Sequence, residues 1–303
     1  SKLYVSATEH PCVLAGGRFE KQNIATLPVL ESGLLDLNAL EETLKNHDKT
    51  SGAAMVSVML ANNETGILQP MEQISKLVLE HDAFLCVDAV QAFGKIPLDI
   101  ANLGAHFIIL SSHKIGGPQG AGALIFGNAS ISANVLIAGG GQENFQRAGT
   151  ENIAAIAGFG AACEQIVQKI AKKDVVGTIR DSIEEGIRTI CHAGGNKIGK
   201  PVFFSSQEHG IDSQNRLPNT TCFAIPGIKA ETALISLDLA GFAVSSGSAC
   251  SSGKVKKSHV LHAMGVSDEV ANCALRISTG YETSPKDAEN FLGEMKNIVN
   301  RMG

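Results

Sequence analysis

The chain has 303 residues, 44% of them hydrophobic and 18% charged, which is typical of a globular protein that can bury a sizeable core. Its net charge of −5 argues against a nucleic-acid-binding protein, which would need a basic face. No apolar run approaches the roughly 18 to 20 residues of a membrane span, so we expect no membrane partner and a cytoplasmic location.

The cysteines and histidines indicate neither a disulfide framework nor a metal site. The seven cysteines include no CxxC pair, and the nine histidines include no HExxH motif. Apolar stretches, where a thiol behaves as a small buried hydrophobe, contain Cys12, Cys86, Cys163 and Cys222.

The first half of the chain alternates short apolar runs with helical patterns. A helix is expected to begin at Pro70, with Ile74, Leu77 and Val78 on one face. This alternation predicts a mainly parallel sheet with right-handed crossovers. The strands of that sheet are predicted at Lys2–Ser6, Met55–Leu60, Phe84–Val87 and Phe107–Leu110.

Polar residues follow three of these strands, at Asn63, Asp88 and Lys114. Because the carboxyl ends of parallel strands meet at one edge of a sheet, we expect the three turns to converge there. Lys114, followed by a glycine-rich loop, suits a carbonyl cofactor held as a Schiff base and anchored by its phosphate. A surface lysine that ends a strand is the alternative.

The second half mixes helices with short strands, which predicts a smaller α+β domain at residues 171–303 behind a large domain at residues 1–170. A helix is expected from about Asn152 to Lys173. The run Phe242–Val244 is predicted as a strand, and so is Leu275–Ser278.

For three further residues the sequence allows two alternative roles each. Asp88 would pair with a cationic pyridine nitrogen or cap the following turn. Cys250, in a run of small residues beside several lysines, would be a reactive loop thiol or an incidental surface cysteine. Arg276 would clamp a carboxylate or face outward from its strand.

Seven motifs, in order along nearly the whole chain, closely resemble those of the NifS/IscS-type cysteine desulfurases, pyridoxal-phosphate enzymes of aminotransferase class V. The motifs are Thr8-Glu9-His10, Asn62-Asn63-Glu64-Thr65-Gly66, Asp88-Ala89-Val90-Gln91, Ser111-Ser112-His113-Lys114, Arg147-Ala148-Gly149-Thr150, Ser245-Ser246-Gly247-Ser248-Ala249-Cys250 and Leu275-Arg276-Ile277-Ser278.

The resemblance implies a role for each residue. Arg276 would bind the carboxylate of L-cysteine, with help from Asn63, and Cys250 would accept the sulfur. The other residues would bind pyridoxal 5'-phosphate: Lys114 as the Schiff base, His10 stacked on the ring and active in proton transfer, Asp88 at the pyridinium nitrogen, Gln91 and Asn63 at the phenolic oxygen, Ser111 and His113 at the phosphate, and Thr150 at the phosphate of a partner subunit.

The implied fold is the α/β fold-type I of pyridoxal-phosphate transferases, in a homodimer. The implied activity removes sulfur from L-cysteine, giving L-alanine and a Cys250 persulfide for an acceptor such as an iron–sulfur scaffold. A selenocysteine lyase, a related class V enzyme and a non-catalytic fragment or scaffold in sulfur transfer are the alternatives.

The beginning of the chain departs from the family. Members of the family start with an N-terminal segment whose Gly-Ala-Thr-Glu loop binds the cofactor phosphate, whereas this sequence opens on the predicted strand Lys2–Ser6. Without that loop we expect weaker cofactor binding by these 303 residues.

Overall fold

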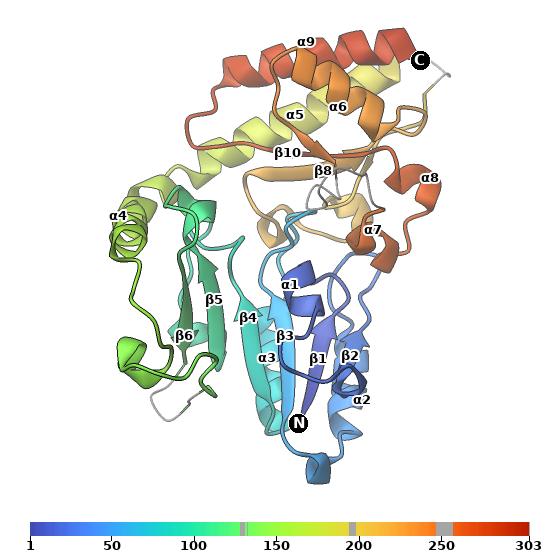
Figure 1. Ribbon diagram of the computed structural model, residues 1–303. Helices are drawn as coiled ribbons and strands as arrows, with labels where there is room; N and C mark the ends of the chain where they lie inside the picture. The colour runs from blue at the N-terminus through green and yellow to red at the C-terminus, as the bar shows by residue number, and fades with distance from the viewer. Residues whose placement is uncertain (128–130, 132, 194–197, 247–256, 303) are drawn as a thin grey trace.

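The computed structural model describes residues 1–127, 131, 133–193, 198–246 and 257–302 (Figure 1). Two sheets organise the described chain, one of six strands in the order β2-β1-β3-β4-β5-β6 and one of four in the order β7-β8-β10-β9. No helix in these ranges is long and apolar enough to cross a bilayer.

The larger sheet is parallel except at one edge, where β6 runs antiparallel to β5. Its strands are β1 (Lys2–Ser6), β2 (Ile24–Leu27), β3 (Ala54–Met59), β4 (Phe84–Asp88), β5 (Phe107–Ser111) and β6 (Gly122–Phe126). The strands expected from the apolar runs are all present, and β2 and β6 are additional.

Helices connect and flank these strands. The short helix α1 (Pro11–Leu14) follows β1, and α2 (Leu37–Lys45) begins at Asp36, whose carboxylate accepts from the N–H groups of Asn38 and Ala39. Helix α3 (Met71–Glu80) buries the face with Ile74 and Val78. The predicted helix from about Asn152 to Lys173 is shorter at its end, as α4 (Ile153–Ile170), and a new helix begins at Lys173.

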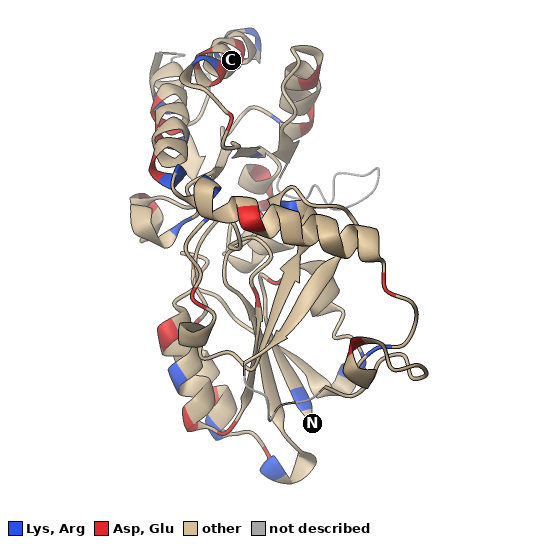
Figure 2. Ribbon diagram, turned by 90° about the vertical axis from the view of Figure 1, so that its left-hand side faces the viewer, with Lys and Arg blue, Asp and Glu red and all other residues tan. Residues whose placement is uncertain are grey.

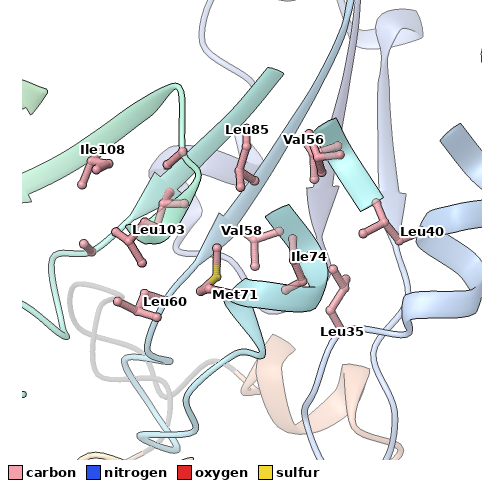
Figure 3. Packing of buried hydrophobic residues seen from close by; sticks show 14 of the residues in the cluster. Leu35, Leu40, Val56, Val58, Leu60, Met71, Ile74, Leu85, Leu103 and Ile108 are labelled. Carbon is pink, nitrogen blue, oxygen red and sulfur yellow. The ribbon is translucent and has the colours of Figure 1, made fainter. Parts of the chain in front are cut away.

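The core of the larger sheet lies between its strands and the helices α2 and α3. Figure 3 shows Val58 of β3 beside Met71 and Ile74 of α3, all three buried. Figure 2 shows the charged residues gathered on helices and loops, with the strands of the larger sheet nearly free of them. Burial of this apolar face is the main stabilising contribution of the sheet.

The smaller sheet is antiparallel and lies beneath three helices in Figure 1. Its strands are β7 (Val202–Phe203), β8 (Thr220–Ala224), β9 (Ser245–Ser246) and β10 (Ala274–Ser278). The covering helices are α5 (Lys173–Ala193), α6 (Ala230–Leu239) and α9 (Pro285–Met302), and α7 (His259–Ala263) and α8 (Asp268–Ala271) lie at the side.

The prediction of a strand at Phe242–Val244 is wrong. Among the described residues the strand β9 covers Ser245–Ser246 instead, and these are the residues that β10 pairs with on that side. Phe242 and Val244 pack against the apolar core of the smaller sheet, which explains their hydrophobic character without a strand.

The substitution Ile108→Ala should lower the free energy of unfolding by about 3 kcal/mol, because it leaves a cavity in the core. Ile108 lies in β5 and is 0% exposed. Urea unfolding followed by circular dichroism measures the change. The control Leu124→Ala, at a side chain that is 49% exposed on β6, should cost less than about 1 kcal/mol. Equal losses in the two variants would contradict this core assignment.

Candidate functional site

The site lies at the carboxyl edge of the larger sheet. Strands β3, β4 and β5 are neighbours, and their register aligns Met59 with Asp88 and Asp88 with Ile109. The polar turns that follow the three strands therefore emerge side by side, as predicted. The turn after β1, which contains His10, emerges at the same edge.

Asp88 is buried at the end of β4, where its Oδ1 accepts from the N–H of Val90 at 2.9 Å. Burial raises the pKa of Asp88, while this hydrogen bond and the nearby His10 act in the opposite direction. A buried carboxylate with so little local compensation is a good partner for a cationic ring nitrogen.

His10 caps helix α1 with its own ring. Nδ1 accepts from the N–H of Cys12 at 3.3 Å and lies 2.9 Å from the Cys12 sulfur. The expectation that Cys12 is a buried thiol is wrong, because the short helix α1 leaves it exposed. Cys86 and Cys163 are only half-buried, and the same expectation holds fully for Cys222.

Lys114 lies in a 3-10 turn, Ser112–Ile115, that directly continues β5. Its side chain is exposed, and Ser111 and His113 beside it are joined by a 2.9 Å contact between Oγ and Nδ1. Gly117 allows the chain to pass close to this turn, since a Cβ there would come within 2.3 Å of the Ser112 hydroxyl. The turn thus presents an amine, a hydroxyl and an imidazole on one short stretch of backbone.

Arg276 brings the smaller sheet to the same edge. It lies on β10, and its Nη1 donates to the carbonyl oxygen of Asn63 at 2.7 Å. Within the described part of the chain its other guanidinium N–H groups have no partner, which leaves them for a carboxylate. The side-chain oxygen of Asn63 is buried and has no hydrogen-bond partner in the described structure, so this amide is also available to a bound molecule.

Two buried carboxyl groups of the site are additional to the predicted residues. The Oε1 atom of Glu9 accepts from the N–H of Met59 at 2.7 Å, while its Oε2 has no partner among the described residues; burial raises the pKa of Glu9 well above its usual value. Burial likewise raises the pKa of Glu64 to about 7, against the opposing effects of a hydrogen bond from Ser258 and the charge of Arg276. The donor, Ser258 Oγ, lies 2.5 Å from Glu64. Both glutamates belong to the quoted motifs, yet nothing in their sequence neighbourhood indicated burial.

Three other predicted site residues, Gln91, Thr150 and Cys250, differ in what the structure shows of them. Gln91 accepts from Lys95 at 2.5 Å, on the turn after β4. Thr150 is exposed on the segment before α4. Cys250 lies outside the described residues. The described residues on either side of it are near the site, since Ser245 pairs with Arg276 and Ser258 binds Glu64.

Comparisons with known proteins identify the family of the chain. The model of the family "Aminotransferase class-V" matches residues 1–291. The chain is 36% identical to cysteine desulfurase NifS of Azotobacter vinelandii over 98% of its own length and 70% of that protein. It is 34% identical to cysteine desulfurase IscS of Dictyoglomus turgidum, over 99% and 72% of the two chains.

A solved structure gives the same result for the fold. The NifS-like protein from Rickettsia africae matches with a TM-score of 0.85 and 34% identity, over 98% of this chain and 75% of that one. The predicted α/β fold and the predicted family are therefore confirmed.

The substitution Glu64→Gln should make the protein more stable than the unchanged chain as pH rises. The folded pKa of about 7 lies above the usual value of 4.5, so the folded state resists ionisation of this side chain. The difference between the two proteins should be absent below pH 4.5, grow between there and 7, and reach about 3 kcal/mol. Urea unfolding across this pH range measures it.

The matched control is Glu72→Gln, on the exposed side of α3. It should leave the pH dependence of the unfolding free energy unchanged. A Glu64→Gln curve parallel to that of the unchanged chain would show that Glu64 ionises as freely when folded as when unfolded.

Proposed function

This chain belongs to the aminotransferase class-V family, and on that basis we propose that it is a pyridoxal-phosphate-dependent cysteine desulfurase, which converts L-cysteine to L-alanine. The observation that carries the proposal is the meeting of two sheets at one edge: Lys114 and Asp88 come from the larger sheet, and Arg276 from the smaller one. Relatives named cysteine desulfurase support the choice of substrate.

The residues at this edge fit the cofactor of the family. Lys114 would hold it covalently, the buried Asp88 carboxylate would pair with its ring nitrogen, and Ser111 and His113 would bind its phosphate. The unpartnered Asn63 oxygen and the Gln91 amide are further polar groups for the ring substituents. Bound pyridoxal phosphate supplies an electron sink for the carbon that loses its proton.

Side chains of this protein would carry out the remaining steps of the reaction. Arg276 binds the substrate carboxylate with the donors that Asn63 does not use, and Lys114 removes the proton from the α-carbon. The Cys250 thiolate attacks the substrate sulfur, so that a sulfur–sulfur bond forms while the carbon–sulfur bond breaks. The electron pair released from the carbon–sulfur bond takes up a proton at the β-carbon, and return of a proton to the α-carbon completes L-alanine, with a persulfide left on Cys250.

We infer that the chain has two domains with different roles. Residues 1–170 would bind the cofactor, and residues 171–303 would contribute Arg276 and Cys250. Separate sheets, each with its own apolar core, support this inference.

We also propose delivery of the sulfur to an acceptor protein, for iron–sulfur cluster assembly or a related pathway, as the NifS and IscS names of the relatives suggest. The six described cysteines are free thiols, which favours a reducing compartment, and we propose the cytoplasm.

We further propose a homodimer. Large apolar side chains are exposed on and just before α4: Phe145 at 73%, Ile153 at 73% and Val167 at 77%. A grouping of exposed apolar residues is typical of a subunit interface. The exposed Thr150 lies in the same stretch, where it could reach the cofactor phosphate in a partner subunit.

The substitution Cys250→Ser should abolish persulfide formation and sulfur transfer, because a hydroxyl is a poor nucleophile toward sulfur, while the visible absorbance of the bound cofactor stays. Lys114→Ala should instead remove the Schiff-base absorbance. The measurements are an absorbance spectrum and alanine release from L-cysteine. Cys222→Ser, at a buried thiol of β8, is the control and should form persulfide normally. Persulfide formation by Cys250→Ser would refute the assignment.

The substitution Val167→Glu should shift the protein from dimer to monomer in sedimentation velocity, because it places a charge in the proposed apolar interface. Leu239→Glu, at a side chain that is 84% exposed at the end of α6, should leave the dimer intact. A Val167→Glu protein that sediments as the unchanged chain does would exclude this face as the interface.

A further inference from the structure

A cavity of about 230 Å³ lies beside Lys114, between the turn after β5 and the segment after β10. Three lysines contribute to its wall, Lys95, Lys114 and Lys169. None of the described residues that line it is Asp or Glu. The cavity therefore gathers positive charge without a carboxylate of its own.

The surroundings of Lys95 disfavour its positive charge. Its Nζ donates to the neutral Oε1 of Gln91 at 2.5 Å. Burial lowers its pKa to about 7, and the charges of Lys114 and Arg276 add to the effect. No ion pair within the described part of the chain includes Lys95, Lys114 or Lys169. Lys95 is half-buried, and an ammonium group partly removed from water without a counter-ion is costly, so an anion in the cavity would relieve that cost.

The uncharged residues that line the cavity indicate which kind of anion would fit. Aliphatic side chains, Ile166 and Val176 among them, also line the cavity, while Asn219 and Thr279 supply neutral polar groups. An inorganic anion would have no apolar part to pack against these aliphatic side chains. A short organic acid would place its carboxylate at the amines and its hydrocarbon part against Ile166 and Val176. A zwitterionic amino acid would bring an ammonium group toward three lysines, which is unfavourable.

We propose that this cavity binds a short-chain aliphatic carboxylate, with Lys95 as its principal charged ligand. The site is separate from the proposed binding of the substrate carboxylate by Arg276, and it does not depend on sulfur transfer. A carboxylate held here would also face the Lys114 amine, so its binding would alter the charge around the lysine that we propose to hold the cofactor.

The test is calorimetric titration of the full chain, without added pyridoxal phosphate or cysteine, at slightly acidic pH where the Lys95 amine is protonated. Butyrate should bind, and the neutral isostere butyramide should not. The substitution Lys95→Met should weaken butyrate binding by at least about tenfold, because it removes a charged hydrogen bond and keeps the stem of the side chain. The exposed Lys76→Met on α3 is the control and should bind butyrate as the unchanged chain does.

Three outcomes would overturn the inference: undiminished butyrate binding by Lys95→Met, equal binding of butyramide, and tighter binding of inorganic phosphate or of L-alanine than of butyrate. If Lys95→Met fails to fold, NMR of the unchanged chain with labelled lysines decides, because butyrate should raise the pKa of the Lys95 amine and butyramide should leave it unchanged. Loss of cysteine turnover in other variants would leave these binding results unaffected, so failure of the proposed function and failure of this site are distinguishable.

Discussion

The parallel pairing of β3, β4 and β5 is the constraint on which the rest of the site depends. Backbone hydrogen bonds fix the levels of Met59, Asp88 and Ile109, and these levels determine where the following turns begin. Side chains alternate between the two faces of a strand, so a slip of one residue would send Asp88 to the opposite face. The apolar contacts of Val58 with Met71 and Ile74 oppose such a slip, because it would expose the core face of β3.

The turn after β3 has a second role, since it is where the two sheets meet. Asn63 accepts from Arg276, Glu64 accepts from Ser258, and Ile67 forms an isolated bridge with Arg216. Arg216 is itself buried and paired with Glu184 of α5. One short polar stretch of the larger sheet therefore contacts three separate parts of the C-terminal half, and movement of the smaller sheet would displace Arg276, the proposed ligand of the substrate carboxylate, relative to Asn63.

Sequence patterns predicted the centre of the larger sheet because its strands are long apolar runs that end in polar turns. They missed β2 and β6 because Ile24–Leu27 is short and mostly half-exposed, and because Gly122 opens a strand at the edge of the sheet. The apolar residues Phe242 and Val244 resembled a strand, but tertiary packing rather than sheet pairing uses them.

The sequence predicted which residues meet at the candidate site better than it predicted the charges and burial around them. The positions of Asp88, Lys114 and Arg276 follow from motif and strand order. Burial of Glu9 and Glu64 does not, because a glutamate is ordinarily a surface residue, and the Ser258 partner of Glu64 is 194 residues away along the chain. The same holds for Lys95, whose environment is made by Lys114 and Arg276 from other parts of the sequence.

The cap that His10 forms on α1 fixes the position of a proton. A backbone N–H can only donate, so the hydrogen bond from Cys12 requires a lone pair on Nδ1 of His10. The neutral imidazole must then carry its hydrogen on Nε2, and that tautomer follows from backbone geometry whatever side chain occupies position 12. Toward any molecule that meets its other nitrogen, the neutral His10 ring is therefore a hydrogen-bond donor.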